Sequence, residues 1–282
     1  LFSKQSNART IDVQSFHLIL RSLNYQKASQ HITAWLNHYC ESAGLSGFII
    51  GISGGIDSAL TSTLCALTGK KTILVNMPIR QSQSEYDRAS HHIADLKKRF
   101  SNVESIEVNL TSIFELMENT YPKDTVENQL AMANTRARLR MTTLYALGQS
   151  NACLVAGTGN KIEDFGVGFF TKYGDGGVDL SPIADLTKSE VKSMAQEVAV
   201  IQEILEAKPT DGLWGDSRTD EDQLGASYPE LEWAMDFVGD ETNLSPREVE
   251  VLAIYRRLNR INKHKMEPIP VCMIPQQIRI SI

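Results

Sequence analysis

The chain has 282 residues, of which 42% are hydrophobic and 22% are charged, a composition typical of a protein that buries a substantial core. This composition excludes an intrinsically disordered chain and a small protein held together by disulfides. Lysine and arginine number 28 against 34 aspartate and glutamate residues, which gives a net charge of −6. Because neutralising a nucleic-acid backbone needs a dense basic face, a broad nucleic-acid surface is not expected. A local basic pocket for a small phosphorylated molecule is compatible with this charge.

The cysteines and the apolar runs limit the class of protein further. The four cysteines are widely spaced and form no C-x-x-C pair, which disfavours a metal cluster or a redox dithiol. No apolar run approaches the ~18 residues that cross a bilayer, and no signal peptide precedes the first charges, so we expect a cytoplasmic protein without membrane partners. Residues 1–10 are expected to be disordered or tag-derived, and 11–282 to form one domain.

Short apolar strands alternate with amphipathic helices along the chain. The predicted strands are 47–52, 72–77, 106–109 and 153–156. The predicted helices are 24–43, about 57–67, 84–99, 126–148, 188–197 and 246–261. This alternation predicts an α/β protein, a parallel sheet with helices on both faces, in which ligands bind beyond the carboxyl ends of the strands. Two polar stretches, 81–87 and 208–227, are predicted to be mobile lids.

A glycine-rich loop, Ser53-Gly54-Gly55-Ile56-Asp57-Ser58, follows the first of these strands and opens a helix. Its two glycines allow a tight turn in which successive N–H groups and the helix N-terminus point at one anion. Asp57 can hold a Mg²⁺ ion that bridges phosphate oxygens. The loop lacks the Gly-Lys-Ser/Thr of a Walker loop and the G-x-G-x-x-G of a dinucleotide fold. The alternative interpretation is a plain strand-to-helix turn with Asp57 favoured by the helix dipole.

A second unusual segment runs from Phe169 to Asp179 and has the sequence Phe-Phe-Thr-Lys-Tyr-Gly-Asp-Gly-Gly-Val-Asp. Aromatic rings, a lysine, two aspartates and three glycines so close together suit a loop around a planar, charged ligand. The alternative is an ordinary glycine-rich turn with both phenylalanines in the core. In the helix before it, an apolar stripe runs along one side, and Asn134 and Arg138 lie together on its rim. Arg136 and Arg140 are expected to be solvated or structural.

These two segments together resemble a known enzyme family. The Ser-Gly-Gly-x-Asp-Ser loop is similar to the pyrophosphate loop of the N-type ATP pyrophosphatases, and residues 169–188 closely resemble the segment that defines ammonia-dependent NAD synthetase. The resemblance covers about residues 45–266. It implies an adenine-nucleotide alpha hydrolase-like (Rossmann-like) three-layer fold and a homodimer. It also implies amidation of deamido-NAD (nicotinic acid adenine dinucleotide) to NAD with ammonia, ATP and Mg²⁺, through an acyl-adenylate that releases AMP and pyrophosphate.

The resemblance also implies which residues bind each substrate. The expected ATP contacts are Gly51, Ile52, Ser53, Gly54, Gly55, Ile56, Asp57, Ser58, Thr158, Lys188 and Thr210. The expected deamido-NAD contacts are Asn134, Arg138, Lys172, Asp179, His264 and Lys265. A His-Lys pair at the end of a helix is otherwise explained by the helix dipole alone. Ile56 and the segment 76–80 depart from the family pattern, so the adenine contacts are not assigned.

Four residues are expected to carry the chemistry. Asp57 and Glu163 match the metal ligands of the family, and Asp164 is a rival because the segment Thr-Gly-Asn-Lys-Ile-Glu-Asp is altered and has one extra residue before Phe169. Lys188 is expected to place its ammonium on the ATP phosphates. The alternative is that Thr187 caps a helix and Lys188 is solvated. Asp175 is the candidate to take a proton from ammonium.

Two other functions are compatible with the loop alone. A different adenylating member of the superfamily, such as a tRNA-modifying enzyme, would need an RNA-binding face and often catalytic cysteines, against which the charge and the scattered cysteines argue. A nucleotide-binding sensor would hold ATP without turnover. Glutamine-using members of the family carry an extra glutaminase domain, and the length leaves no room for one, so free ammonia is the expected donor unless a separate subunit supplies it.

Overall fold

The computed structural model describes residues 23–207 and 219–279, so the expectation for residues 1–10 lies outside the described residues. Its sheet has four parallel strands, β1 (Gly47–Gly51), β2 (Lys71–Asn76), β3 (Val103–Glu107) and β4 (Cys153–Val155), in the order β3-β2-β1-β4. The register aligns Ile49 of β1 with Ile73 of β2 and with Val155 of β4. The chain therefore builds the sheet outward from β1 in one direction and then returns to add β4 on the other side.

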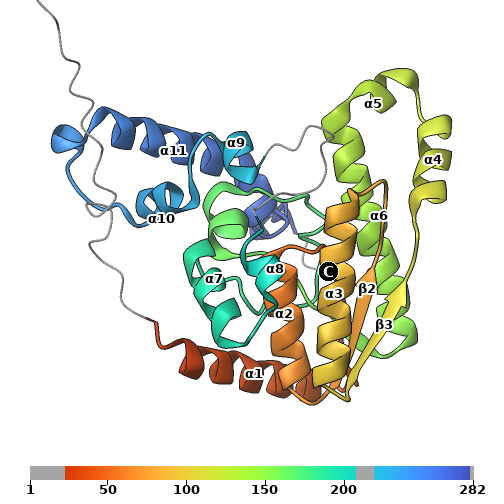
Figure 1. The fold of residues 1–282 in the computed structure, drawn as a ribbon. Coiled ribbons are helices and arrows are strands. Elements are labelled where there is room, and N and C mark those ends of the chain that lie inside the picture. Colours follow the sequence, from red (N-terminus) through yellow and green to blue (C-terminus); the bar gives the residue numbers. More distant parts are fainter. Residues whose placement is uncertain (1–22, 208–218, 280–282) are drawn as a thin grey trace, which may run out of the picture.

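Helices cover both faces of this sheet (Figure 1). One face packs against α1 (Tyr25–Ser42), α2 (Ile56–Leu67), α3 (Gln83–Arg99) and α7 (Lys188–Glu197). The other packs against α4 (Thr111–Thr120) and α6 (Gln129–Ser150), with the short α5 (Lys123–Glu127) between them in sequence. Side chains of β1 alternate accordingly, since Phe48 and Ile50 join the first core and Ile49 joins the second. The predicted α/β class, a parallel sheet between two helical layers, is confirmed.

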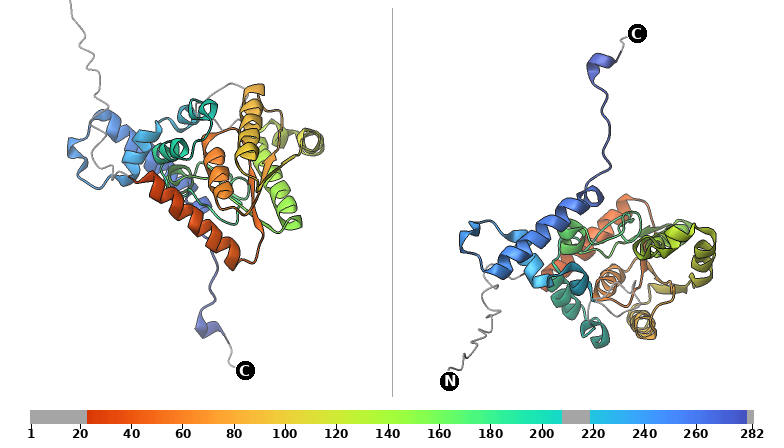
Figure 2. Two further views of the ribbon diagram at one scale, coloured as in Figure 1. Left: turned by 60° about the horizontal axis from the view of Figure 1, so that its bottom comes forward. Right: turned by 90° about the horizontal axis from the view of Figure 1, so that it is seen from above.

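A third hydrophobic cluster lies beside the sheet, and its helices near the C-terminus are drawn in blue in Figures 1 and 2. It is built from η2 (Lys161–Val167), α9 (Asp220–Leu224), α10 (Tyr228–Asp236) and α11 (Pro246–Met266). The remaining elements are α8 (Gln202–Leu205), η3 (Glu241–Asn243) and η4 (Gln276–Ile278). The cluster packs the turn that contains Glu163 against α10 and α11.

Capping boxes in the sequence explain where several helices begin. Thr187 and Glu190 form a capping box at the start of α7, so Thr187 does cap that helix. Ser82 and Glu85 form another, which begins α3 at Gln83. Most of the stretch 81–87 is therefore the first turn of a capped helix, and its role as a mobile lid stays a prediction. β3 also begins earlier than predicted.

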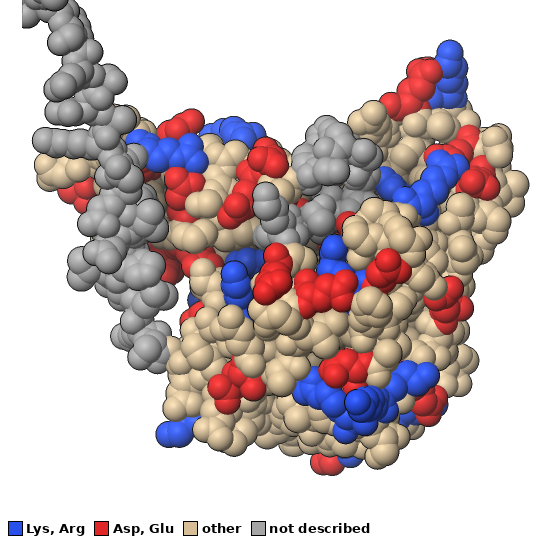
Figure 3. Space-filling view, in the orientation of Figure 1, with Lys and Arg blue, Asp and Glu red and all other residues tan. Residues whose placement is uncertain are grey.

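Of the second predicted lid, residues 208–218 lie outside the described residues, and α9 follows from Asp220. Within residues 23–207 and 219–279, no helix has both the length and the apolar character needed to cross a membrane. Figure 3 shows acidic and basic side chains mixed over this face, with basic side chains gathered at its lower right.

Candidate active site

A cavity of about 670 Å³ opens at the carboxyl ends of β1 and β4. This is the point where the strand order reverses, at which open parallel sheets bind their ligands. Its walls come from the glycine-rich loop 51–58, from α6, from the turn 156–164, from the loop 168–178, from Lys188 and from the end of α11. Segments far apart in sequence therefore converge on one space, as the sequence predicted.

The loop 51–58 is held in shape by its own hydroxyl groups. The Ser53 and Ser58 side-chain oxygens lie 3.1 Å apart, and the Gly55 N–H donates to the Ser53 oxygen at 3.1 Å. Gly54 has φ +82°, and a Cβ there would come within 2.6 Å of the Glu85 carbonyl oxygen, so only glycine fits this turn. No side chain caps α2 at Gly55. The first turn of α2 thus presents N–H groups suited to a phosphate.

Lys188 lies between two carboxylates at the edge of this loop. Its Nζ is 2.6 Å from an Asp57 oxygen and 2.9 Å from a Glu163 oxygen, and the residue is only 9% exposed. Burial opposes the charge of Lys188, but the two carboxylates outweigh it and raise the pKa of the ammonium. The interpretation of Lys188 as a solvated residue is therefore wrong. Burial also opposes the charge of Glu163, but Lys188 and Tyr228 hold the pKa of that carboxyl below its usual value.

Asp57 and Glu163 have the chemistry expected of magnesium ligands. They already share one cation, the ammonium of Lys188, and their donor atoms are oxygens. Among the described residues, no group of three or more histidine, cysteine, aspartate or glutamate side chains is placed to hold a metal. Mg²⁺ commonly binds through one or two carboxylates together with substrate phosphates, so a pair beside a phosphate loop fits this ion.

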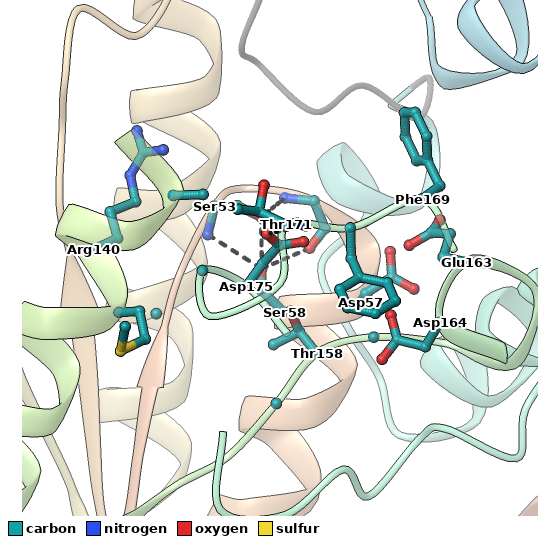
Figure 4. A pocket seen from close by; sticks show the side chains of 18 of the residues that line it. Ser53, Asp57, Ser58, Arg140, Thr158, Glu163, Asp164, Phe169, Thr171 and Asp175 are labelled. Carbon is teal, nitrogen blue, oxygen red and sulfur yellow. Dashed lines mark hydrogen bonds between the residues drawn. The ribbon is translucent and has the colours of Figure 1, made fainter. Parts of the chain in front are cut away.

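Asp164 lines the same cavity without joining the pair (Figure 4). Lys188 contacts Glu163 and Asp57, and no contact between Lys188 and Asp164 is present. Burial and the neighbouring Glu163 and Asp175 charges raise the pKa of Asp164 to about 8. Gly159 faces this carboxyl, and a Cβ at Gly159 would lie 1.9 Å from an Asp164 oxygen. The geometry favours Glu163 as the partner of Asp57.

Sequence reasoning missed two residues that hold these carboxylates. Asn160 is fully buried, and its amide donates to Asp57 at 3.0 Å while its oxygen accepts from the Glu163 N–H at 3.1 Å. An asparagine just before a turn that begins with acidic residues is an N-cap signal that could have revealed it. The Tyr228 hydroxyl donates to Glu163 at 2.6 Å, and its ring centroid lies 4.9 Å from the Lys188 Nζ. Tyr228 is 65 residues away from Glu163, and no local signal indicates the contact.

Arg140 was expected to be either solvated or structural. It lines the cavity from α6, on the side opposite Asp57, Glu163 and Asp164 (Figure 4). Its Nε donates to the Met77 carbonyl oxygen at 3.1 Å, and burial with the nearby Arg136 charge lowers its pKa to about 10. Of these two expectations the structure favours the structural one, because the guanidinium binds the backbone at Met77.

Five of the six residues expected to contact deamido-NAD gather around the loop 168–178 and line the cavity: Asn134, Arg138, Lys172, His264 and Lys265. Asn134 accepts from the Thr171 hydroxyl at 2.6 Å, and Arg138 donates to the Lys172 carbonyl oxygen at 3.3 Å. The Lys172 ammonium donates to the His264 carbonyl oxygen, and Lys265 donates to the Phe170 carbonyl oxygen at 2.9 Å. Two helices, α6 and α11, therefore both hold this loop at residues 170–172.

The remaining predicted residues have different positions. Asp179 does not line the cavity, because its oxygens accept from the Tyr145 hydroxyl at 3.0 Å and the Val155 N–H at 2.8 Å. Asp175 lines it and accepts from the Thr171 N–H at 2.9 Å, and burial raises the pKa of Asp175. Thr158 also lines it, and Thr210 lies outside the described residues.

The model of the family described as NAD synthase matches residues 28–267. The chain belongs to the NAD synthase family. An NH(3)-dependent NAD(+) synthetase of Mycoplasmopsis pulmonis is 43% identical over 204 residues, which cover 72% of this chain and 76% of the relative. One of Finegoldia magna is 36% identical over 228 residues, 80% of this chain and 90% of the relative. This membership confirms the resemblance seen in the sequence and does not favour a tRNA-modifying enzyme.

The NAD synthase family also accounts for the architecture. A solved NMN synthetase of Francisella tularensis superposes with a TM-score of 0.75 at 29% identity, covering 90% of this chain and 99% of the other. The adenine-nucleotide alpha hydrolase-like fold expected from the sequence is the fold of this chain, with its glycine-rich loop after β1 and its acidic turn after β4.

Proposed function

We propose that the protein makes NAD by amidating deamido-NAD with ammonia and ATP, releasing AMP and pyrophosphate. The observation that carries the proposal is the position of Lys188 between Asp57 and Glu163, beside the loop 51–58 and in the same cavity as the residues around 168–178. One space thus holds a site suited to a triphosphate and a site suited to a second, charged substrate.

The first step would activate the nicotinate carboxylate, which is a poor acylating agent because its leaving group would be oxide. A carboxylate oxygen attacks the α-phosphorus of ATP, the bond from that phosphorus to the β-phosphate bridge breaks, and pyrophosphate leaves. No side-chain nucleophile is required, since the substrate carboxylate is the nucleophile. Catalysis then consists of aligning two anions and neutralising their charge.

The residues around the loop would supply that neutralisation. Backbone N–H groups of 53–58 and the start of α2 would bind the phosphates, and Lys188 would turn its ammonium onto them when ATP enters. Asp57 and Glu163 would hold a magnesium ion. When bound, this ion supplies charge neutralisation and orientation of the phosphate oxygens. Arg140 supplies a further buried positive charge on the opposite wall.

The second step would join nitrogen to the activated carbon. Ammonia attacks the acyl carbon, the bond from that carbon to the adenylate oxygen breaks, and AMP leaves with the electron pair. Ammonium must lose a proton before it attacks, and the nitrogen releases a second one to water after AMP has left. Asp175 is the proposed acceptor for the first of these protons, since its carboxylate is buried in the cavity wall and already hydrogen-bonded in place by Thr171.

A second candidate substrate is the mononucleotide. The structure from Francisella tularensis that superposes with this chain is an NMN synthetase, and the same two chemical steps on nicotinic acid mononucleotide would give NMN. The relatives named for NAD(+) synthetase are more similar in sequence, so the dinucleotide is the first choice.

A donor and substrate comparison tests the proposal. Deamido-NAD and the mononucleotide are each incubated with ATP and Mg²⁺, once with ammonium and once with glutamine, and NAD, NMN, AMP and pyrophosphate are separated and measured. The proposal predicts NAD with ammonium and none with glutamine. Faster amidation of the mononucleotide would make it, and not deamido-NAD, the substrate. Pyrophosphate release without either NAD or NMN would refute the amidation.

We further propose that the protein acts in the cytoplasm as a homodimer, with residues 11–282 as one catalytic unit. Large apolar side chains exposed on α4 and α6, among them Leu116 and Leu130, support a subunit interface on that side. Sedimentation of the purified protein would test the dimer.

A further inference from the structure

Helix α10 contacts both η2, which carries Glu163, and α7, which begins with Lys188. Tyr228 at the start of α10 makes the first of these contacts. Its hydroxyl donates to a Glu163 oxygen at 2.6 Å, and that same oxygen accepts from Lys188 at 2.9 Å. The face of the Tyr228 ring lies against the ammonium, with 4.9 Å from the Lys188 Nζ to the ring centroid. Tyr228 is only 3% exposed, so both contacts are sheltered from water.

The second contact is one turn further along α10. Glu232 accepts from the Ser189 N–H at 2.9 Å, and Ser189 directly follows Lys188 in the first turn of α7. A carboxylate at a helix N-terminus satisfies an otherwise unpaired N–H group. The start of α7, and with it the backbone of Lys188, is therefore fixed by α10.

Helix α10 is itself held in place by α11. Arg247 of α11 binds Glu230 of α10 through two nitrogens, at 2.7 and 2.8 Å. Leu231 and Ala234 are buried on the side of α10 that joins the cluster with Val251 of α11. Bidentate pairing and apolar burial on one helix leave little freedom for Tyr228 to move.

We propose that Tyr228 is a positioning residue that fixes Glu163 and Lys188 for the incoming metal–nucleotide complex, and that Glu232, also on α10, assists by holding the start of α7. The hydroxyl donates a hydrogen bond to one Glu163 oxygen and thereby orients the carboxylate toward Asp57. The ring holds the Lys188 ammonium at the position from which it transfers to the phosphates. This inference rests on the proposed function, because it takes Asp57 and Glu163 as the metal ligands.

The test measures metal binding directly. Mn²⁺ is titrated by electron paramagnetic resonance into the whole protein together with a non-hydrolysable ATP analogue. Tyr228→Phe keeps the ring and removes only the hydroxyl, and loss of such an outer partner typically weakens metal binding about 10- to 100-fold. We expect at least a tenfold weaker Mn²⁺ affinity for this variant. The matched control is Tyr255→Phe, which removes a hydroxyl from the same hydrophobic cluster and should bind Mn²⁺ as the native protein does.

A kinetic readout separates positioning from a general structural effect. The Mg²⁺ concentration that half-activates Tyr228→Phe should rise by about the same factor, while kcat at saturating Mg²⁺ is retained within roughly twofold. Glu232→Leu provides a second variant and should weaken Mn²⁺ binding in the same direction. Thermal unfolding shows whether each variant is folded.

The outcomes distinguish this inference from the proposed function. If the native protein with the analogue binds no Mn²⁺, the metal site itself is refuted, and this inference with it. If the native protein binds Mn²⁺, and the folded variants Tyr228→Phe and Glu232→Leu bind it equally well, only the positioning role is overturned. Weaker binding in Tyr228→Phe with unchanged binding in Tyr255→Phe supports it.

Discussion

Replacing Lys188 by methionine would leave Asp57 and Glu163 facing each other without a cation. Their side chains are 17% and 16% exposed, and the Lys188 Nζ lies within 2.6 and 2.9 Å of them. Removing one partner of a buried ion pair typically costs 3–5 kcal/mol of unfolding free energy. Because both carboxylates keep a neutral hydrogen-bond donor, Asn160 for one and Tyr228 for the other, we expect the lower end, about 3 kcal/mol near pH 8.

The loss of unfolding free energy in Lys188→Met should depend on pH. Without the cation, burial raises the pKa of both carboxyls above the values near 4 of the unfolded chain. The folded variant then binds more protons than the unfolded chain between roughly pH 4 and those raised pKa values, so its stability relative to native increases as the pH falls. Urea unfolding of the unliganded protein at several pH values measures this. Lys161→Met is the matched control, since its exposed ion pair with Asp185 is worth at most about 1 kcal/mol.

A divalent cation should partly replace the missing ammonium. We expect Mg²⁺ alone to stabilise Lys188→Met more than the native protein, because the vacated position lies between two carboxylates. A variant as stable as native near pH 8, or a loss that neither pH nor Mg²⁺ changes, would refute the assignment of Lys188 as the cation that pairs Asp57 with Glu163.

Three further perturbations follow from the geometry. Gly159→Ala would place a Cβ 1.9 Å from an Asp164 oxygen, so we expect a loss of about 1–3 kcal/mol in thermal unfolding, and an unchanged midpoint would contradict the contact. Asp175→Asn should slow NAD formation while sparing ammonia-independent adenylate formation in a rapid-quench assay, and equal loss of both steps would exclude Asp175 as the proton acceptor. Burial lowers the pKa of His92 to about 4, from about 6.5 in an unfolded chain, so unfolding free energy attributable to His92 should fall by at most about 3 kcal/mol as the pH drops through this range. His92→Gln, measured beside native by urea unfolding, should flatten that part of the profile, and identical slopes would show that His92 contributes nothing.

Local sequence signals were sufficient for the elements around the phosphate loop. Buried β1, two glycines and the first turn of α2 are contiguous, so short-range chemistry determines their arrangement. The same holds for Thr187 and Glu190, whose spacing predicts the start of α7. Ser82 and Glu85 likewise have the spacing of a capping box, which indicates that α3 begins within the polar stretch 81–87.

Contacts between distant segments could not be predicted from local patterns. Tyr228 reaches Glu163 only because α10 packs in the third hydrophobic cluster, and Arg140 is buried only because α6 forms a wall of the cavity. Asp179 was expected beside the substrate, yet it bonds to Tyr145 and to the backbone of β4. In each case tertiary packing decides the environment of a polar side chain whose own sequence neighbours do not indicate it.

Oxygen-18 in the substrate carboxylate provides the most direct measurement of the central claim. Deamido-NAD labelled there is incubated with the protein, ATP, Mg²⁺ and ammonium, and the products are analysed by mass spectrometry. If the carboxylate attacks the α-phosphorus and ammonia then displaces the adenylate, AMP carries one labelled oxygen and appears in equal amount with NAD. Label found in pyrophosphate or in inorganic phosphate, or NAD formed with unlabelled AMP, would contradict the acyl-adenylate route through this cavity.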